Sequence, residues 1–372
     1  MITLIHTADV HLGVKFRRLG ARAEHMTDLP KKAFTKVCDL AIARNAQVLL
    51  IAGDLFDSNT VPEALIHFAE SELSRVAKAG VKVVLTAGTH DRLEGNSVLL
   101  RMNLPSSVTL LLPEKPQVDF SDLNLSVCGF SNTFNKSVES PLEKLHASQG
   151  EALKYRVAMV HASVAIDSKH APDDYPVEVT EIENGEWNYV AFGHWHRAQE
   201  IVKNKAWYAG SPETLKLEDA GSGKALVVTL SDDGVATIEP VQTGSVQFDT
   251  LDITLEGEFS SDALQRKILQ AADPMLSRTV TLRGVIQPTQ FVDIASLTSQ
   301  TSDAFFALKI LDKTTVQMDA ETLNAFPDEL VIGQYVRLLQ NEISLETDAA
   351  KKKRLEKALQ LGIALIQGKE VL

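Results

Sequence analysis

The feature that most constrains this chain is a set of five short apolar segments, each followed at once by a polar stretch with histidine or aspartate. The segments are rich in β-branched residues, which is typical of strands buried on both faces of a sheet. Helical spacing at 31–44 and 62–79 separates the first three, and Pro62 suits the first turn of a helix. Strands that alternate with helices predict a layered α/β domain. The five segments are residues 2–5, 47–52, 81–87, 156–160 and 189–192.

The polar stretches after these segments carry imidazole and carboxylate groups. In a doubly wound sheet, the loops at the carboxyl ends of the strands share one edge, so we expect the five loops to converge there. A single Asp-x-His or His-x-His is weak evidence because it occurs by chance, whereas the joint pattern is a strong signal. His6 lies outside it and is expected to be structural. The stretches are ADVHLG, AGDLFDS, AGTHDR, VHAS and FGHWHR, with side chains Asp9, His11, Asp54, Asp57, Thr89, His90, Asp91, His161, His194 and His196.

The types of side chain in these loops indicate a metal-assisted reaction. Imidazole and carboxylate without thiolate suit Mn²⁺, Fe²⁺, Zn²⁺ or Mg²⁺, and not a structural zinc site. The loops offer more ligands than one ion needs, and a shared carboxylate can bridge two ions about 3.5–4 Å apart. Such a pair acidifies a bridging water to a hydroxide nucleophile and clamps the oxygens of a phosphoryl group. The residues alone therefore predict phosphate-ester hydrolysis.

The rest of the chain changes character twice. Residues 224–241 have the pattern of a hairpin with Asp233-Gly234 as its turn. From near residue 245, strand-like and helix-like segments alternate, enough for a small α+β domain. From about 328 the pattern is helical to the end. We therefore predict an α/β domain at 1–245, an α+β domain at 246–320 and C-terminal helices at 321–372.

The two C-terminal helices each present a narrow apolar face. Thr347 and Asp348 are N-cap candidates for the second helix. Such faces suit packing of the helices on each other or on their own domain. The expected faces are Val331, Tyr335 and Leu338 on the first helix, and Leu355, Leu359, Ile363 and Ile366 on the second.

Composition and charge argue against a disulfide-rich protein, a membrane-spanning protein and a protein that binds nucleic acid over its whole surface. Two cysteines are too few for a disulfide framework, and no apolar stretch approaches the roughly 18 residues that span a bilayer. With no signal-peptide pattern, we expect a cytoplasmic protein without a membrane anchor. The net charge of −12 argues against a surface that binds nucleic acid over its whole extent. Residues 13–37 differ, with seven Lys or Arg against Glu24 and Asp28, although a solvated loop can carry such charge.

The five stretches, in this order, resemble the calcineurin-like metallophosphoesterase superfamily, whose pattern is D-x-H, G-D-x-x-D, G-N-H-[DE], H and G-H-x-H. The resemblance covers residues 2 to about 200. HTADVHLG, AGDLFDS and FGHWHRAQ followed by WYAGSPE look like the SbcD-type branch, the nuclease subunits of double-strand-break processing complexes. Protein phosphatases of the superfamily have arginine and glycine after the second Asp of G-D-x-x-D, where this chain has Ser58 and Asn59.

The resemblance implies two divalent ions, with Mn²⁺ favoured and Mg²⁺, Fe²⁺ or Zn²⁺ as alternatives. Asp9, His11 and His196 would hold one ion. Asp54 would bridge to the second, which His161, His194 and the residue at position 89 complete. His90 would act near the leaving group and Asp91 would accept its ring N–H. Asp57 would support these residues without binding metal.

Thr89 departs from the family pattern, which has asparagine at this position. A threonine hydroxyl is one carbon closer to the backbone than an asparagine carbonyl, and a neutral hydroxyl is the poorer ligand. We expect second-metal binding that is weakened but not abolished. A water that fills the gap and a position altered to weaken catalysis are both consistent with this substitution.

The resemblance also implies DNA as substrate, an SbcC-like coiled-coil ATPase as partner on the C-terminal helices, and homodimerisation through helices of the first domain. Phosphate contacts position a strand without reading its sequence. On that basis the candidates for contact with DNA are Lys15, Arg17, Arg18, Arg22, Arg92 and Arg197.

Three functions are consistent with the sequence. The leading one is a metal-dependent nuclease of DNA repair and recombination, exonucleolytic on double-stranded ends and endonucleolytic on single strands. The second is a phosphodiesterase for small nucleotides, which the same metal site could serve. The third is a catalytically weakened subunit that binds DNA ends or the ATPase, for which Thr89 is the support.

Overall fold

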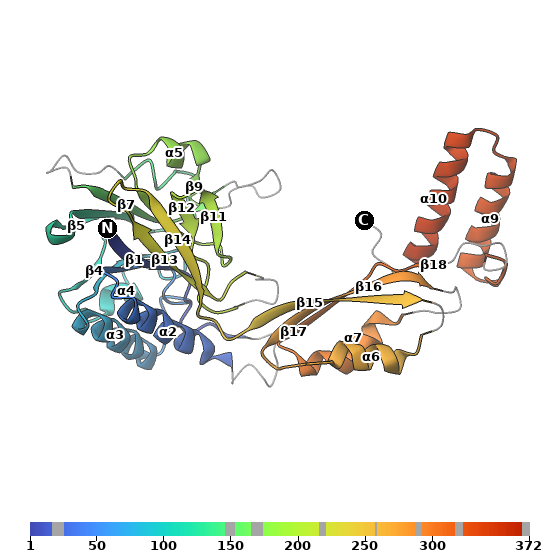
Figure 1. The fold of residues 1–372 in the computed structure, drawn as a ribbon, viewed down its shortest axis with the longest axis horizontal. Helices are drawn as coiled ribbons and strands as arrows, with labels where there is room; N and C mark the ends of the chain where they lie inside the picture. The colour runs from blue at the N-terminus through green and yellow to red at the C-terminus, as the bar shows by residue number, and fades with distance from the viewer. Residues whose placement is uncertain are drawn as a thin grey trace. The chain divides into compact units, whose positions relative to one another are not determined.

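The computed structural model divides the chain into two compact units, Met1–Ser245 and Val246–Leu372 (Figure 1). It describes residues 1–16, 26–145, 153–164, 174–215, 221–256, 259–286, 292–316 and 323–366. Each unit has its own hydrophobic core. The assignment of separate roles to 246–320 and 321–372 remains a prediction.

The first unit contains two six-stranded sheets. In the first sheet, β1 to β4 run parallel, β13 is antiparallel to β1, and β14 pairs with β13 in the predicted hairpin. Gly234 turns this hairpin with a positive φ of 84°. The strand order is β14 (Ala236–Gln242), β13 (Lys224–Leu230), β1 (Ile2–Thr7), β2 (Val48–Ala52), β3 (Lys82–Thr86) and β4 (Val108–Leu110).

The second sheet has parallel strands at its centre and antiparallel strands at both edges. Two short strands, β8 (Ser163–Val164) and β9 (Pro176–Val177), and the helix α5 (Val179–Asn184) lie outside it. The strand order is β11 (Gln199–Val202), β12 (Ala206–Tyr208), β10 (Tyr189–Gly193), β7 (Tyr155–His161), β6 (Leu125–Phe130) and β5 (Gln117–Phe120).

The layered α/β class is confirmed, but the single doubly wound sheet is wrong. Segments 2–5, 47–52 and 81–87 form strands of the first sheet, whereas 156–160 and 189–192 belong to the second. Periodicity could not separate these cases, because a strand covered by helices and a strand covered by another sheet are both apolar on two faces.

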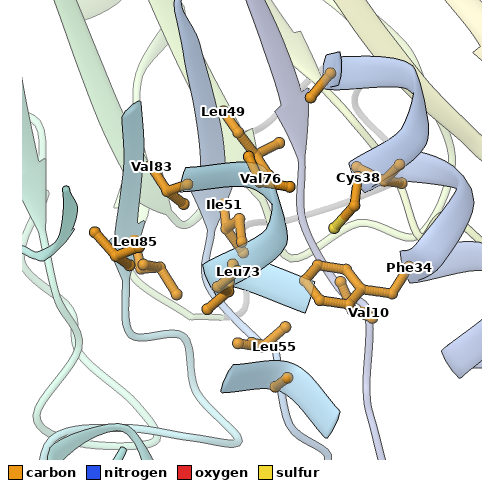
Figure 2. Close-up of a cluster of buried hydrophobic side chains, with 14 of the residues drawn as sticks. Val10, Phe34, Cys38, Leu49, Ile51, Leu55, Leu73, Val76, Val83 and Leu85 are labelled. Carbon is orange, nitrogen blue, oxygen red and sulfur yellow. The ribbon is translucent and has the colours of Figure 1, made fainter. Parts of the chain in front are cut away.

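The core of this unit has separate layers on the two faces of the first sheet. Alternate residues such as Leu4 and Leu50 face the second sheet and pack with Val157 and Met159. Full burial of such a side chain contributes about 1.5–3 kcal/mol. The opposite face packs against α2 (Leu29–Ala43) and α3 (Glu63–Lys78). Figure 2 shows this second layer, with Phe34, Cys38, Leu73 and Val76 from the helices and Leu49, Ile51, Val83 and Leu85 from the strands.

The two covering helices begin at prolines in different ways. Pro30 lies in the first turn of α2, where its missing N–H has no intrahelical partner to lose. Pro62 was expected in a first turn but is the N-cap of α3, with an extended ψ of 139°. The two positions are adjacent, and sequence spacing does not distinguish them. A further short helix, α4 (Val98–Arg101), follows β3.

The second unit begins with a parallel sheet and two helices, so the predicted alternation of strands and helices is confirmed. Its strands are β15 (Gln247–Glu256), β16 (Leu276–Ile286), β17 (Ala307–Asp312) and β18 (Thr315–Val316). The helices are α6 (Ser261–Leu269) and α7 (Ile294–Thr301), whose Leu264, Ile268 and Leu297 share a core with Val280 and Leu282.

Two helices end the described chain, α9 (Val331–Leu345) and α10 (Ala349–Ile366), and they pack on each other. Asp348 accepts hydrogen bonds from the N–H groups of Ala350 and Lys351, which confirms it as a cap. On α10, Leu359 and Ile363 are buried as expected, Leu355 is partly buried and Ile366 is exposed. No helix among the described residues is long and apolar enough to cross a membrane.

The expected inward face of α9 is wrong at two positions. Val331 and Leu338 are 74% and 62% exposed, whereas Val336 and Leu339 are buried. Tyr335 does face α10, and its hydroxyl donates to the carbonyl of Ala358 at 2.8 Å. The buried stripe is displaced by about one residue from the expected stripe, because helical spacing allows both and only the packing of α10 selects one.

The buried His6 on β1 provides a test of this packing. Its Nδ1 lies 2.8 Å from the hydroxyl of Tyr189 on β10, a link between the two sheets. Burial lowers the pKa of His6 from 6.5 to about 3. The unfolded chain therefore binds a proton that the folded chain excludes, and stability falls as the pH drops from 6.5 towards 3, by up to about 1.4 kcal/mol per pH unit.

We expect His6→Asn to reduce this acid sensitivity, because asparagine keeps a polar partner for Tyr189 but does not titrate. The measurement is urea unfolding of both proteins at pH 7, 5 and 4. The loss of stability between pH 7 and 4 should be larger in the wild type. Equal losses in the two proteins would show that His6 is not the group responsible.

Candidate metal centre

The loops after β1 and β2 are locked to each other by their backbones. Asp9 N–H donates to the Gly53 carbonyl at 3.1 Å, and His11 N–H donates to the Asp54 carbonyl at 3.0 Å. Asp9, His11 and Asp54 all have φ near +50°, a left-handed conformation that costs free energy in residues other than glycine. Strain of this kind clusters at functional sites, where the surrounding structure enforces it.

Asp9, His11 and His196 form the first group of possible ligands. One ligand atom from each lies within 4.8 Å of the others, and the His11 and His196 rings are 5.1 Å apart between centroids. Both carboxylate oxygens of Asp9 also accept from the N–H of His194 at 3.1 Å. Asp9 follows β1 and His194 follows β10, so this contact joins the two sheets at the site.

Asp9, Asp54 and His161 form the second group, again with ligand atoms within 4.8 Å of one another. The Oδ2 of Asp54 is 3.2 Å from Nε2 of His161 and 3.6 Å from Nε2 of His11. The His194 ring lies 5.3 Å from that of His161. Asp54 therefore lies between ligands of both groups.

The donor set fits divalent ions. The Nδ1 of His161 lies 3.0 Å from the Ala52 carbonyl, which can only accept, so Nδ1 carries hydrogen and Nε2 faces Asp54. Nε2 of His161 faces the Asp54 carboxylate at 3.2 Å, and Nε2 of His11 is buried with no hydrogen-bond partner among the described residues. A buried imidazole nitrogen that faces carboxylates is suited to bind a divalent ion.

The electrostatics of these side chains also fit a divalent ion. Burial disfavours charge on His161, but Asp54 and Asp9 outweigh it and raise the pKa of His161 to about 10. Burial alone would raise the pKa of Asp54, whereas His161 and His11 hold it well below its usual range. Protonated imidazole thus supplies the positive charge that a cation would supply on binding.

Glycines allow the backbone to approach this cluster closely. A Cβ on Gly88 would overlap the carboxylate and backbone nitrogen of Asp54. Gly53 has a positive φ of 86°, and a Cβ there would meet the ring of His161. Glycine has no Cβ, so it permits both the close approach of the backbone and the positive φ.

In the third loop, the expected contact between Asp91 and the His90 ring is wrong. Asp91 is buried and accepts from the backbone N–H groups of Gly88, Phe56 and Asp54, at 2.8, 3.2 and 3.3 Å. Burial and the charge of Asp54 raise the pKa of Asp91 to about 7. Asp91 therefore holds the backbones of the second and third loops together. The sequence pattern does not reveal this role.

Asp57 takes the position expected for Asp91. Its carbonyl lies 2.9 Å from Nδ1 of His90, and its Oδ1 lies 3.2 Å from Nδ1 of His11. Because a carbonyl only accepts, Nδ1 of His90 donates, which leaves Nε2 of this half-exposed ring for other partners.

Thr89 is half-buried between Gly88 and His90, whose backbones lie against Asp54. The N–H of the next residue, His90, donates to Oδ1 of Asp54 at 2.8 Å. Within the described chain, Thr89 makes a hydrogen bond through its carbonyl, with Arg92 at 3.4 Å. The loop thus delivers residue 89 to the edge of the cluster, with a side chain shorter than the expected asparagine.

The candidate DNA-contacting residues have different surroundings. Arg17, Arg18 and Arg22 lie outside the described residues. Lys15 and Arg197 are exposed. Arg92 pairs with Glu94 at 3.0 Å, so part of its charge is already neutralised.

Sequence reasoning missed Asn132, which is buried next to His161. It lies two residues after the apolar strand LSVCGF, a pattern of strand and polar residue like that of the other loops. The residues after this strand, Ser131 and Asn132, are neither histidine nor aspartate, so the pattern of ligand-type side chains does not mark it.

Comparison with known proteins identifies the class. A family model described as calcineurin-like phosphoesterase matches residues 2–198, and the chain belongs to that family. It is a metal-dependent phosphoesterase with the layered α/β fold expected from the sequence.

Proteins named "DNA double-strand break repair protein Mre11" are among its relatives. The one from Methanocaldococcus jannaschii is 22% identical over 367 residues, covering 91% of this chain and 95% of that protein. The one from Sulfolobus acidocaldarius is 26% identical over 220 residues, 58% of this chain and 56% of that protein. The one from Methanopyrus kandleri is 29% identical over 230 residues, 57% and 49% respectively. The chain thus spans only about half of the last two proteins.

Gly88→Ala tests the packing around Asp54. We expect it to lower divalent-metal affinity and phosphoesterase activity by about 100-fold, because the added methyl displaces the Asp54 carboxylate, which lies close to ligands of both groups. Gly95→Ala is the matched control, since a Cβ at Gly95 meets nothing within 4 Å. Manganese binding by calorimetry and hydrolysis of a model phosphodiester are the readouts. Equal manganese affinity and equal activity in the two variants would contradict the close packing of Gly88 against Asp54.

Proposed function

We propose that this protein is a metal-dependent DNA nuclease that hydrolyses phosphodiester bonds, acting as an exonuclease on double-stranded ends and as an endonuclease on single strands. The observation that carries the proposal is the position of Asp54, whose carboxylate lies 3.2 Å from His161 and 3.6 Å from His11. A carboxylate that lies close to ligands of both groups suits a two-metal site for phosphoryl transfer. The relatives named as DNA repair proteins support DNA as the substrate.

The proposed site assigns different residues to the two ions. Asp9, His11 and His196 would hold one divalent ion, and His161 and His194 the other, with Asp54 between them and position 89 at the edge. Ions in such a site supply Lewis acidity and lower the pKa of water, and Mn²⁺ is the metal we favour. Asp9 also fixes His194 through its backbone N–H, which keeps ligands from both sheets in register.

His90 is suited to protonate the leaving oxygen. Its ring is half-exposed, and Nδ1 is committed to the Asp57 carbonyl at 2.9 Å. The free nitrogen, Nε2, can then give a proton to a departing alkoxide and recover it from solvent. Asp57 orients both His90 and His11, so it couples the proton donor to a metal ligand.

The test is manganese-dependent degradation of end-labelled linear duplex DNA by the wild type, Thr89→Asn and Asp54→Ala. We expect the wild type to cut, Asp54→Ala to lose at least about 1000-fold because both ions lose a ligand, and Thr89→Asn to gain about tenfold. Removal of metal with a chelator should abolish cutting.

Other outcomes of this test select other functions. If only Thr89→Asn cuts, this chain is the weakened subunit that binds DNA ends or the ATPase. If no variant cuts DNA but a small cyclic nucleotide is hydrolysed in an Asp54-dependent reaction, the substrate is a small phosphodiester and the nuclease proposal is wrong.

An SbcC-like coiled-coil ATPase is the partner we propose for the α9–α10 hairpin. Val331, Leu338 and Leu345 lie seven residues apart along α9, and each is more than 60% exposed. This spacing aligns them in one stripe that α10 leaves uncovered, and a seven-residue repeat matches the surface of a coiled coil.

We expect Leu338→Glu to weaken binding of such an ATPase subunit by about tenfold or more while the hairpin stays folded, because position 338 is 62% exposed. Ser344→Glu is the control, since it adds the same charge at an exposed position away from the stripe. Binding is measured by co-purification and calorimetry with the full-length chains. Equal affinities for the two variants would contradict this docking surface.

A further inference from the structure

Asn132 is a fully buried polar residue that the proposed mechanism does not use. It lies two residues beyond the end of β6. Its Nδ2 donates to the backbone carbonyl of His161 at 3.1 Å, and its Oδ1 is buried with no hydrogen-bond partner in the described part of the chain. A buried amide oxygen left unpaired is costly, so the structure keeps this side chain for a reason other than packing.

The backbone of the same residue fastens the third metal-site loop. Asn132 N–H donates to the Ala87 carbonyl at 3.1 Å, and its own carbonyl accepts from Leu93 N–H at 2.8 Å. The hydroxyl of Ser131 accepts from Ala87 N–H at 3.0 Å. These bonds fix both ends of residues 87–93, which follow β3 in the first sheet, to the end of β6 in the second.

We propose that Asn132 is a positioning residue for the second metal ion, a role that rests on the two-metal site of the proposed function. Two parts of that ion's coordination come from different sheets, His161 at the end of β7 and position 89 after β3. Asn132 contacts both segments, one through its side chain and the other through its backbone. Asn132 thereby fixes the separation between the end of β7 at His161 and the loop that carries residue 89. The side chain of Thr89 is shorter than the asparagine expected at this position.

The side chain is the part of this connection that substitution can remove. The backbone bonds to Ala87 and Leu93 are available to any residue at position 132, whereas the bond to the His161 carbonyl requires the amide N–H. Its loss frees the end of β7 from the third loop. Hydrogen-bonding partners that orient metal ligands typically change metal affinity by about 10–100-fold when they are mutated.

The experiment compares Asn132→Ala with Asn188→Ala by calorimetric titration of the full chain with Mn²⁺, without DNA. Asn188 is the matched control: its Oδ1 accepts from Arg156 N–H at 2.7 Å and its Nδ2 donates to the Gly234 carbonyl at 3.0 Å. It therefore secures the start of β7 as Asn132 secures the end. We expect two ions in the wild type, about a tenfold or greater loss in affinity for the weaker ion in Asn132→Ala, and unchanged affinities in Asn188→Ala.

A second variant guards against misfolding. Asn132→Leu keeps the shape of the side chain and removes both the donor and the unpaired oxygen, so we expect the same selective loss with a thermal unfolding temperature close to that of the wild type. Unchanged affinity for the weaker ion, or equal weakening of both ions, in a folded variant overturns the role of Asn132. A wild type that binds fewer than two ions contradicts the proposed function instead.

Discussion

Three carboxylates, those of Asp9, Asp54 and Asp91, are buried together between two β-sheets, and their need for compensating charge and hydrogen bonds shapes the structure around them. Buried charges persist only when they are paired, hydrogen-bonded or bound to metal. Asp91 is satisfied by three backbone N–H groups, and its raised pKa lets it become neutral. Asp54 and Asp9 face imidazole instead, and that difference separates the structural carboxylate from the two suited to hold ions.

The backbone is strained where it delivers these groups. Asp9, His11 and Asp54 adopt left-handed conformations, and Gly53 and Gly88 make room for the side chains that crowd around them. The two hydrophobic layers of the first sheet provide the stability that offsets this strain. Ligands from both sheets then meet only if the sheets stay in register, which the contacts of Asp9 with His194 and of His6 with Tyr189 help to maintain.

The sequence predicts the strands and most of the candidate ligands. The predictions that were wrong or missing have physical causes. Strands that end in His or Asp were recognised because apolar runs and ligand-type side chains are both visible locally. Their division between two sheets was not, because burial on both faces looks the same whichever layer covers a strand. The role of Asp91 was misassigned because a carboxylate next to a histidine in sequence can turn towards backbone N–H groups instead. Asn132 was missed because its importance comes from long-range contacts that no spacing encodes.

The central claim is that two divalent ions bind between the sheets and share Asp54. A crystal soaked in Mn²⁺, with anomalous scattering recorded at the manganese edge, tests it most directly. We expect two peaks about 3.5–4 Å apart, one among Asp9, His11 and His196 and one between His161 and His194, with the Asp54 carboxylate touching both. The second peak should have the lower occupancy, because Thr89 is a poor ligand. A single peak, or peaks away from Asp54, would contradict the account.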